Sequence, residues 1–143
     1  MKTRFASRVI LITSDDEVLF LKFDRSNIGE PPQYGLPGGE IHENESPSKA
    51  AARELFEETG LIKSIHETPD FFLTFPHTLP NGEKTISEEY FFILPIQKEK
   101  ISHKNMQKDE KEILINHEWV KINNIEKINT SPGHLCEKIK NAR

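Results

Sequence analysis

The sequence predicts an α+β fold, an α/β/α sandwich in which a mixed β-sheet lies between helices. Three observations lead to this class. Runs of β-branched and aromatic residues predict several strands, one segment has both ends of a helix marked, and strands and helices do not alternate regularly. The irregular order argues against a doubly wound parallel sheet. At 143 residues, the chain is expected to fold as a single domain over residues 1–143 with a core of its own.

The start of the chain predicts two paired strands. Residues 4–13 and 17–23 are apolar runs, and Ser14, Asp15 and Asp16 between them favour a tight turn and an antiparallel hairpin. Residues 24–39 are rich in glycine and proline and predict a long loop. Ordered loops of this length usually carry function, so we expect part of a binding site there.

The clearest helix is predicted for residues 47–59. Ser46 is a suitable N-cap, Pro47 fits the first helical position, and Gly60 stands where a left-handed C-cap belongs. Both ends of this helix are therefore marked by local chemistry.

The second half of the chain predicts more strands and a helical tail. Residues 62–78 and 83–96 read as extended segments on either side of the turn at residues 79–82, whose Asn81-Gly82 pair is a strong hairpin signal. Residues 114–120 predict another strand. Residues 122–140 predict a helical tail in which Ser131-Pro132 restarts the last helix.

Charge and composition narrow the function classes. The formal net charge of −4 provides no broad positive field, so neither a dedicated nucleic-acid-binding module nor a stable nucleic-acid partner is expected. Phosphates on a ligand would have to be met locally, by a few basic side chains or by metal ions held on carboxylates.

The expected location is the cytoplasm, with no membrane partner. Cys136 is the lone cysteine and has no second cysteine with which to form a disulfide. No apolar stretch approaches the ~18 residues that a membrane-spanning helix needs. The amino-terminal residues read as a first strand and not as a targeting signal.

A cluster of glutamates is predicted on the helix at residues 47–59. At 100° per residue, Glu54, Glu57 and Glu58 share an arc of about 100°. Beside them lies an expected apolar stripe made of Ala52, Leu55 and Phe56. Like charges at these spacings repel, whereas a divalent cation with a preference for hard oxygen ligands, Mg²⁺ or Mn²⁺, would relieve the repulsion. The competing interpretation of three such glutamates alone is a solvated acidic face.

Residues 39–61, GEIHENESPSKAAARELFEETGL, resemble the Nudix box of the Nudix hydrolases without a gap. The matching positions are Gly39, Glu45, Arg53, Glu54, Leu55, Glu57, Glu58, Gly60 and Leu61. The preceding Leu36-Pro37-Gly38-Gly39-Glu40 is also similar to the family, whereas Tyr34 stands where many members carry tryptophan. The resemblance covers roughly residues 5–125 and implies a Nudix fold, in line with the α/β/α sandwich.

The resemblance implies a MutT-like hydrolase that uses Mg²⁺, or alternatively Mn²⁺, to cleave the pyrophosphate linkage of a nucleoside diphosphate joined to another moiety. The implied catalytic residues are Glu54, as base or ligand, with Glu57 and Arg53. Arg53 is expected to orient Glu45 or Glu54.

The implied metal ligands are Glu54, Glu57, Glu58, the carbonyl of Gly39, and either Glu112 or Glu110 from a loop before the strand at 114–120. Glu110 and Glu112 can equally belong to a solvated charge run. Gly38, Gly39 and Tyr34 are the expected substrate-binding residues.

The resemblance leaves the substrate open among dNTP or NTP, ADP-ribose and nucleotide-sugar types. Pro76 stands fifteen residues after Leu61, a spacing similar to that of some ADP-ribose-cleaving members. The competing class is a catalytically idle nucleotide-binding module of the same fold, which usually lacks box glutamates, and here none is lost. An RNA-processing hydrolase is a third alternative, disfavoured by the acidic net charge. Many relatives dimerise, so a homodimer is a further alternative.

Overall fold

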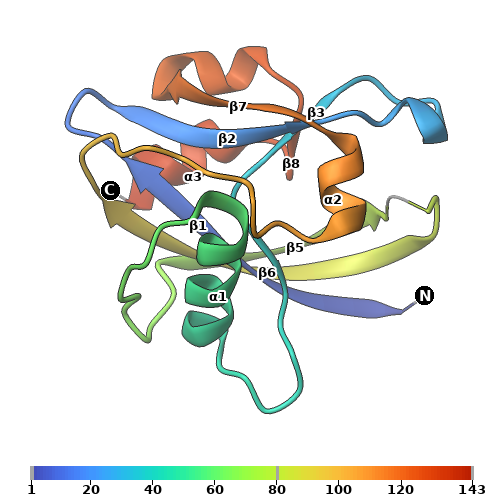
Figure 1. The fold of residues 1–143 in the computed structure, drawn as a ribbon, viewed down its shortest axis with the longest axis horizontal. Coiled ribbons are helices and arrows are strands. Elements are labelled where there is room, and N and C mark those ends of the chain that lie inside the picture. The colour runs from blue at the N-terminus through green and yellow to red at the C-terminus, as the bar shows by residue number, and fades with distance from the viewer. Residues whose placement is uncertain (1, 80, 143) are drawn as a thin grey trace.

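The computed structural model describes residues 2–79 and 81–142. Within these residues the strands form one mixed sheet with helices on both faces (Figure 1). The strands are β1 (Thr3–Ile12), β2 (Glu17–Phe23), β3 (Gln33–Gly35), β4 (Gly38–Glu40), β5 (Phe71–Thr78), β6 (Lys84–Pro95), β7 (Leu114–Lys121) and β8 (Thr130–Ser131). The helices are α1 (Pro47–Thr59), α2 (Lys108–Ile113) and α3 (Leu135–Ala142), with 3₁₀ turns η1 (Ser26–Ile28) and η2 (Ile122–Lys127). The predicted α+β class is confirmed.

The sheet opens between its first two strands. β1 and β2 pair antiparallel at Ile12 and Val18, next to their connecting turn. Farther from the turn, β4 pairs with β1, whereas β7 pairs along the length of β2. On its other edge β1 runs parallel to β6. The divergence of β1 from β2 leaves space into which side chains from several elements project.

Two apolar cores lie on the two faces of the sheet, because strand side chains alternate. Val9 and Leu11 of β1 face the α1 side, where they pack with Ala51 and Leu55. Ile10 and Ile12, one residue out of phase with them, belong to the core on the other face. That core also holds Leu135, Cys136 and Ile139 of α3. The sandwich layers follow from this alternation.

Helix α1 begins and ends where the sequence predicts. Ser46 Oγ accepts a hydrogen bond from the Lys49 N–H at 3.2 Å, and Gly60 adopts a left-handed φ of 78°. The predicted apolar stripe is partly wrong, since Phe56 is 39% exposed. The buried face instead runs through Ala51, Leu55 and Thr59, spaced four residues apart, and Phe56 lies about 100° away from it.

The long loop predicted for residues 24–39 is wrong in part, because it contains η1, β3 and β4. β3 pairs with β2 and also with β8, about a hundred residues later in the chain. The extended segment predicted for residues 62–78 forms a strand only from Phe71 onward. The predicted hairpin at residues 79–82 is confirmed by the antiparallel register of Thr78 with Lys84. Pro80, which was placed in that turn, lies outside the described residues.

The tail differs most from prediction. In place of a helix over residues 122–140, the chain forms η2, the short strand β8 and then α3. Ser131-Pro132 does not restart the helix, because Thr130 and Ser131 pair with β3 and the last helix begins at Leu135. The strand predicted for residues 114–120 is confirmed as β7. It is preceded by α2, which the sequence did not predict.

Among the described residues, no helix combines the length and apolar character needed to cross a bilayer. Cys136 is buried and donates its Sγ–H to the carbonyl of Ile122. Its role in this structure is packing.

Candidate active site

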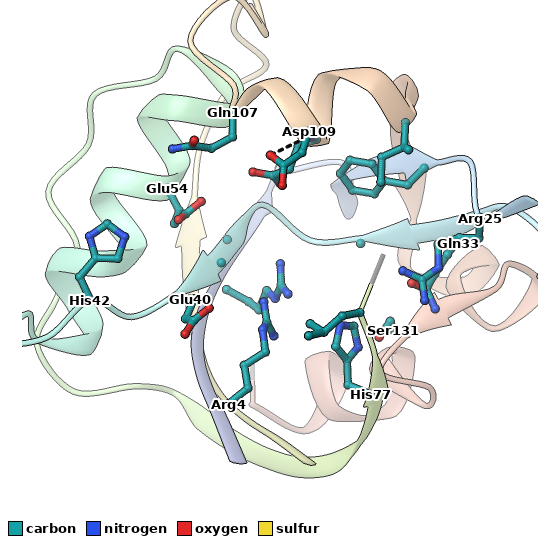
Figure 2. Close-up of a pocket in the computed structure, with 18 residues that line it drawn as sticks. Arg4, Arg25, Gln33, Glu40, His42, Glu54, His77, Gln107, Asp109 and Ser131 are labelled. Carbon is teal, nitrogen blue, oxygen red and sulfur yellow. Dashed lines mark hydrogen bonds between the residues drawn. The ribbon is translucent and has the colours of Figure 1, made fainter. Parts of the chain in front are cut away.

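A cavity of about 450 Å³ lies where the sheet opens (Figure 2). Its walls come from strands β1 to β5, from β8 and from helices α1 and α2, so residues from near both ends of the chain meet there. Acidic side chains from α1 and α2 line one part of the cavity, and arginine side chains of β1 line another. The volume lies in the range of small-molecule binding pockets, about 300–1,000 Å³.

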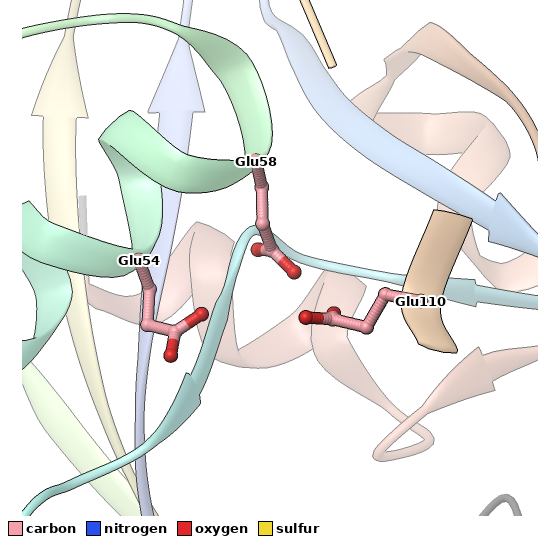
Figure 3. A group of neighbouring side chains, drawn as sticks. All are labelled: Glu54, Glu58 and Glu110. Atoms are coloured by element: carbon pink, nitrogen blue, oxygen red, sulfur yellow. The ribbon is translucent and has the colours of Figure 1, made fainter. Parts of the chain in front are cut away.

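Three carboxylates converge beside this cavity, and two of them, Glu54 and Glu110, line it. Each of Glu54, Glu58 and Glu110 contributes an oxygen that lies within 4.8 Å of the others (Figure 3). Glu54 and Glu58 stand one turn apart on α1, and Glu110 reaches them from α2. In the described part of the chain, no other group of three or more metal-ligating side chains meets this spacing. We call these three residues the carboxylate trio.

The trio is electrostatically unfavourable without a cation. Glu58 is 1% exposed, and burial, followed by the neighbouring Glu110, raises its pKa well above the ordinary range. Burial also raises the pKa of Glu54, although Arg53 opposes the shift. Buried carboxylates with raised pKa values gain from a positive charge placed among them. The trio offers hard oxygen ligands, which suit Mg²⁺ or Mn²⁺.

Two glycines bring backbone against the trio. Gly38 donates its N–H to Glu58 Oε1 at 2.6 Å, inside the buried part of the site. A Cβ on Gly39 would lie 2.7 Å from Glu54 Cδ, so a side chain there would fill the space next to the trio. The predicted Gly38 and Gly39 thus lie in the cavity wall, beside the carboxylates.

Arg53 holds the acidic side chains around it. Its Nε donates to Glu45 Oε2 at 2.8 Å, and one of its Nη atoms donates to Glu54 Oε1 at 2.7 Å. The other Nη atom donates to Glu45 Oε1 and to the carbonyl of Glu40, both at 3.0 Å. The structure therefore shows Arg53 contacting both of the carboxylates that it was expected to orient.

Three predicted site residues lie apart from the trio. The Glu57 carboxylate faces Arg53 and Gln107, at 3.5 and 3.4 Å. Glu112 is exposed, on the side of α2 away from Glu110, because two residues on a helix differ by about 200°. Tyr34 packs edge-on against Phe20, while its neighbours Gln33 and Gly35 line the cavity.

Sequence reasoning missed several residues of the cavity, chiefly Arg4, Arg8 and His77. Burial, and next the charge of Arg4, lower the pKa of His77 to about 4, so this ring is neutral at pH 7. One signal was available in the sequence. Arg4 and Arg8 stand four residues apart in the predicted first strand, so strand alternation places them on the same face.

Comparison with known proteins agrees with the box motif. The family model described as NUDIX domain matches residues 2–137. An RNA pyrophosphohydrolase of Bartonella clarridgeiae is 36% identical over 74 residues, which cover 46% of this chain and 43% of that protein. The chain thus spans less than half the length of the curated relatives it matches, between 27% and 43%.

Solved structures share the fold. A MutT protein from Methanosarcina mazei superposes with a TM-score of 0.69 at 19% identity, covering 99% of this chain and 93% of that one. An Ap4A hydrolase from C. elegans superposes with a TM-score of 0.64 at 21% identity, covering 96% of each chain. At these identities the likeness establishes the architecture.

Proposed function

Because the chain belongs to the NUDIX domain family, we propose that it is a pyrophosphohydrolase. The substrate we propose is a nucleoside diphosphate joined through its pyrophosphate linkage to another moiety, and the reaction depends on a divalent cation. The observation that carries this proposal is the convergence of Glu54, Glu58 and Glu110, of which Glu54 and Glu110 line the cavity. A catalytically idle nucleotide-binding module does not require such a cluster, in which Glu54 and Glu58 are buried and Glu110 is half-buried.

The residues that would hold the cation are those of the trio. Glu54, Glu58 and Glu110 supply three oxygens, and the Gly39 carbonyl and Glu57 are further candidate ligands from the box. Mg²⁺ is the cation proposed, with Mn²⁺ as the alternative, since both prefer oxygen ligands. When bound, such an ion neutralises phosphate oxygens and makes water more acidic, which a pyrophosphate bond requires for attack.

The chain's own residues position the reacting groups. We propose that Glu54 acts as general base or ligand, and that Arg53 is a positioning residue that fixes it. Support comes from the contact between Arg53 and Glu54 Oε1 at 2.7 Å and from the two contacts that tie Arg53 to Glu45. A base held in one rotamer keeps its oxygen at hydrogen-bonding distance from the attacking water.

Two substrate classes are favoured by separate observations. The size of the cavity fits a small nucleotide of the dNTP, ADP-ribose, nucleotide-sugar or dinucleoside polyphosphate type. RNA with a terminal pyrophosphate is the second class, supported by the identity to proteins named RNA pyrophosphohydrolase. The net charge of −4 favours the small nucleotides, because it provides no extended positive surface for an RNA chain.

The proposal also covers the cellular location and the partners of the protein. We propose that residues 1–143 act as one domain in the cytoplasm, where the buried, unpaired Cys136 stays reduced. The partners proposed are small-molecule nucleotides.

The test is hydrolysis with Mg²⁺ or Mn²⁺ across a panel of substrates, read as inorganic phosphate after coupling to a pyrophosphatase or a phosphatase, as each product requires. The panel contains ADP-ribose, dinucleoside polyphosphates, nucleotide sugars, all dNTPs and a short RNA with a 5′-triphosphate. Turnover of at least one substrate, abolished by removing divalent ions, supports the proposal. Absence of turnover on the whole panel, together with no binding of Mg²⁺ or Mn²⁺ in a calorimetric titration, would overturn it.

A further inference from the structure

A buried ion cluster forms part of one wall of the cavity. Its residues belong neither to the trio nor to the Nudix box. Glu89 of β6 is 1% exposed and sits between two arginines of β1. Its Oε1 accepts from Arg8 Nε at 3.0 Å, and its Oε2 accepts from Arg4 Nη1 at 3.1 Å. Ser87 donates its hydroxyl to the same Oε2 at 2.8 Å. We call Arg4, Arg8 and Glu89 the arginine wall.

Strand register explains how the cluster forms. β1 and β6 run parallel, and Glu89 is the partner of Ala6, midway between Arg4 and Arg8. These three β1 residues share one face of the strand, so the two arginine side chains flank the glutamate. Ala6 is fully buried, and its methyl group leaves space for the carboxylate between them.

The wall carries a net positive charge toward the cavity. Burial alone would raise the pKa of Glu89, but Arg8 and Arg4 outweigh it and lower the pKa, so the carboxylate stays ionised. Two guanidinium groups against one carboxylate leave one positive charge. Both arginines line the cavity, and within the described residues Nε and Nη2 of Arg4 donate no hydrogen bond to the protein.

Stability alone does not account for this arrangement. Replacing a buried ion pair by apolar residues is often neutral or stabilising, so an ion cluster at a cavity wall is weak evidence for a structural role. Guanidinium groups bind phosphate through paired charge-assisted hydrogen bonds and stay charged at any working pH. Arg4 also lies on the opposite side of the cavity from Asp109 of α2 and from Gln107, the residue that precedes α2 (Figure 2).

We propose that Arg4 and Arg8 form a phosphate-binding subsite that works without metal ions, and that Glu89 is the positioning residue that holds both guanidinium groups in the wall. The inference deepens the proposed function and rests on it for the identity of the anion. One phosphate of the substrate would lie against the wall while another faces the trio.

The role of Glu89 can be separated from a simple charge effect, because the two have opposite signs. If Glu89 only offset positive charge, Glu89→Gln would strengthen anion binding, since the wall would gain a net positive charge. If Glu89 positions the arginines, Glu89→Gln weakens binding, because the guanidinium groups lose the carboxylate that orients them. Without the Glu89 carboxylate, the remaining contact of Arg4 is with the uncharged hydroxyl of Ser87.

The experiment is a calorimetric titration with inorganic tripolyphosphate in low-salt buffer freed of metal ions by a chelating resin. We expect Arg4→Gln and Arg8→Gln each to weaken binding about tenfold, the equivalent of one charge-assisted hydrogen bond. Glu89→Gln should weaken it in the same direction. Glu99→Gln, which removes a carboxylate from the surface ion pair with Lys63, is the matched control and should bind as the wild type does. Circular dichroism shows whether each variant is folded.

Each result decides one part of the proposal. Wild-type affinity in both arginine variants, or no binding by the wild type, would overturn the subsite, and tighter binding by Glu89→Gln would overturn the positioning role. If Glu89→Gln fails to fold, Glu89→Asp keeps the charge on a shorter side chain. It should then bind more weakly than the wild type, and wild-type affinity there would refute positioning. Because this titration involves no metal and no turnover, its outcome is separate from that of the proposed function. Metal-free binding of tripolyphosphate, together with neither hydrolysis of any nucleotide nor binding of Mg²⁺ or Mn²⁺, would overturn the proposed function and leave the subsite intact.

Discussion

The backbone N–H of Gly38 donates a 2.6 Å hydrogen bond to Oε1 of the buried Glu58. This contact joins β4 to the last turn of α1, so the strand and the helix of the box motif are coupled at the carboxylate trio. Gly38 has a φ of +152° and its amide points into a site where a carboxylate is 1% exposed. The position of Glu58 therefore depends on the backbone of β4.

The two glycines of β4 should respond differently to alanine. A Cβ on Gly38 would lie 2.0 Å from the backbone carbonyl oxygen of Ser7, which cannot move without breaking β1. A Cβ on Gly39 would meet the end of the flexible Glu54 side chain at 2.7 Å. We expect Gly38→Ala to lower the thermal unfolding midpoint strongly. Gly39→Ala should stay folded and lose most turnover because Glu54 is displaced. Equal midpoints in the two variants would contradict this distinction.

The carboxylates of α2 should differ in their effect on turnover. Glu110 belongs to the trio, whereas Glu112 is exposed on the other side of the helix. We expect Glu58→Gln and Glu110→Gln to lower kcat by about two orders of magnitude or more if they hold the cation. The fold loss in kcat caused by Glu112→Gln should be smaller than that caused by Glu110→Gln by a factor of about ten or more. Steady-state kinetics at saturating Mg²⁺ measure both, and the reverse order would assign the ligand to Glu112.

The role of Glu57 can be tested in the same assay. Its carboxylate faces Arg53 and Gln107 in the structure, so we expect Glu57→Gln to weaken activity chiefly through a higher Mg²⁺ requirement. The measurement is the Mg²⁺ concentration at half-maximal rate. A loss of kcat that persists at saturating Mg²⁺ would instead place Glu57 in direct contact with the reacting groups.

Substituting Arg53 should disorder the site without unfolding it. Lysine keeps the positive charge but cannot bind Glu45 with a planar fork and contact Glu54 at the same time. Removing the partner of a metal ligand typically costs about 10- to 100-fold in metal affinity or activity, and we expect Arg53→Lys to fall in this range. Kinetics together with circular dichroism check the result. A variant with wild-type kcat and Mg²⁺ affinity would remove Arg53 from the positioning role.

His77 should make the protein sensitive to mild acid. Its pKa is lowered from 6.5 to about 4 by burial and by Arg4, so the folded state disfavours the protonated ring. As the pH falls, His77 therefore takes up a proton in the unfolded chain before it does so in the folded protein. The stabilising contribution of the neutral His77 ring is fully present above pH 6.5 and is lost as the pH drops toward 4. Between pH 7 and pH 4.5, the unfolding midpoint of the wild type should decrease more than that of His77→Gln. Equal decreases would show that the ring titrates normally.

The local parts of the fold were predictable from the sequence. The ends of α1 follow from Ser46, Pro47 and Gly60, whose capping chemistry acts within a few residues. The turn between β1 and β2 and the hairpin between β5 and β6 follow from turn residues next to β-branched runs. The strands that were missed, β3, β4 and β8, are short and are stabilised by partners far along the chain. Their own two or three residues contain too little periodicity to predict them.

The sequence by itself determined the fold class, the family and the helix that carries Glu54, Glu57 and Glu58, because spacing on one helix is a local property. Only the tertiary structure decided which carboxylates meet. The fold brings the Glu110 carboxylate of α2 close to those of Glu54 and Glu58 on α1. A run of charged residues in the sequence does not reveal which of its side chains face another element. The arginine wall was likewise decided by register, since Arg4 and Glu89 are 85 residues apart and meet only where β1 pairs with β6. The chemistry of each side chain can be read from the sequence. Which side chains converge depends on contacts between strands and helices that are distant in sequence.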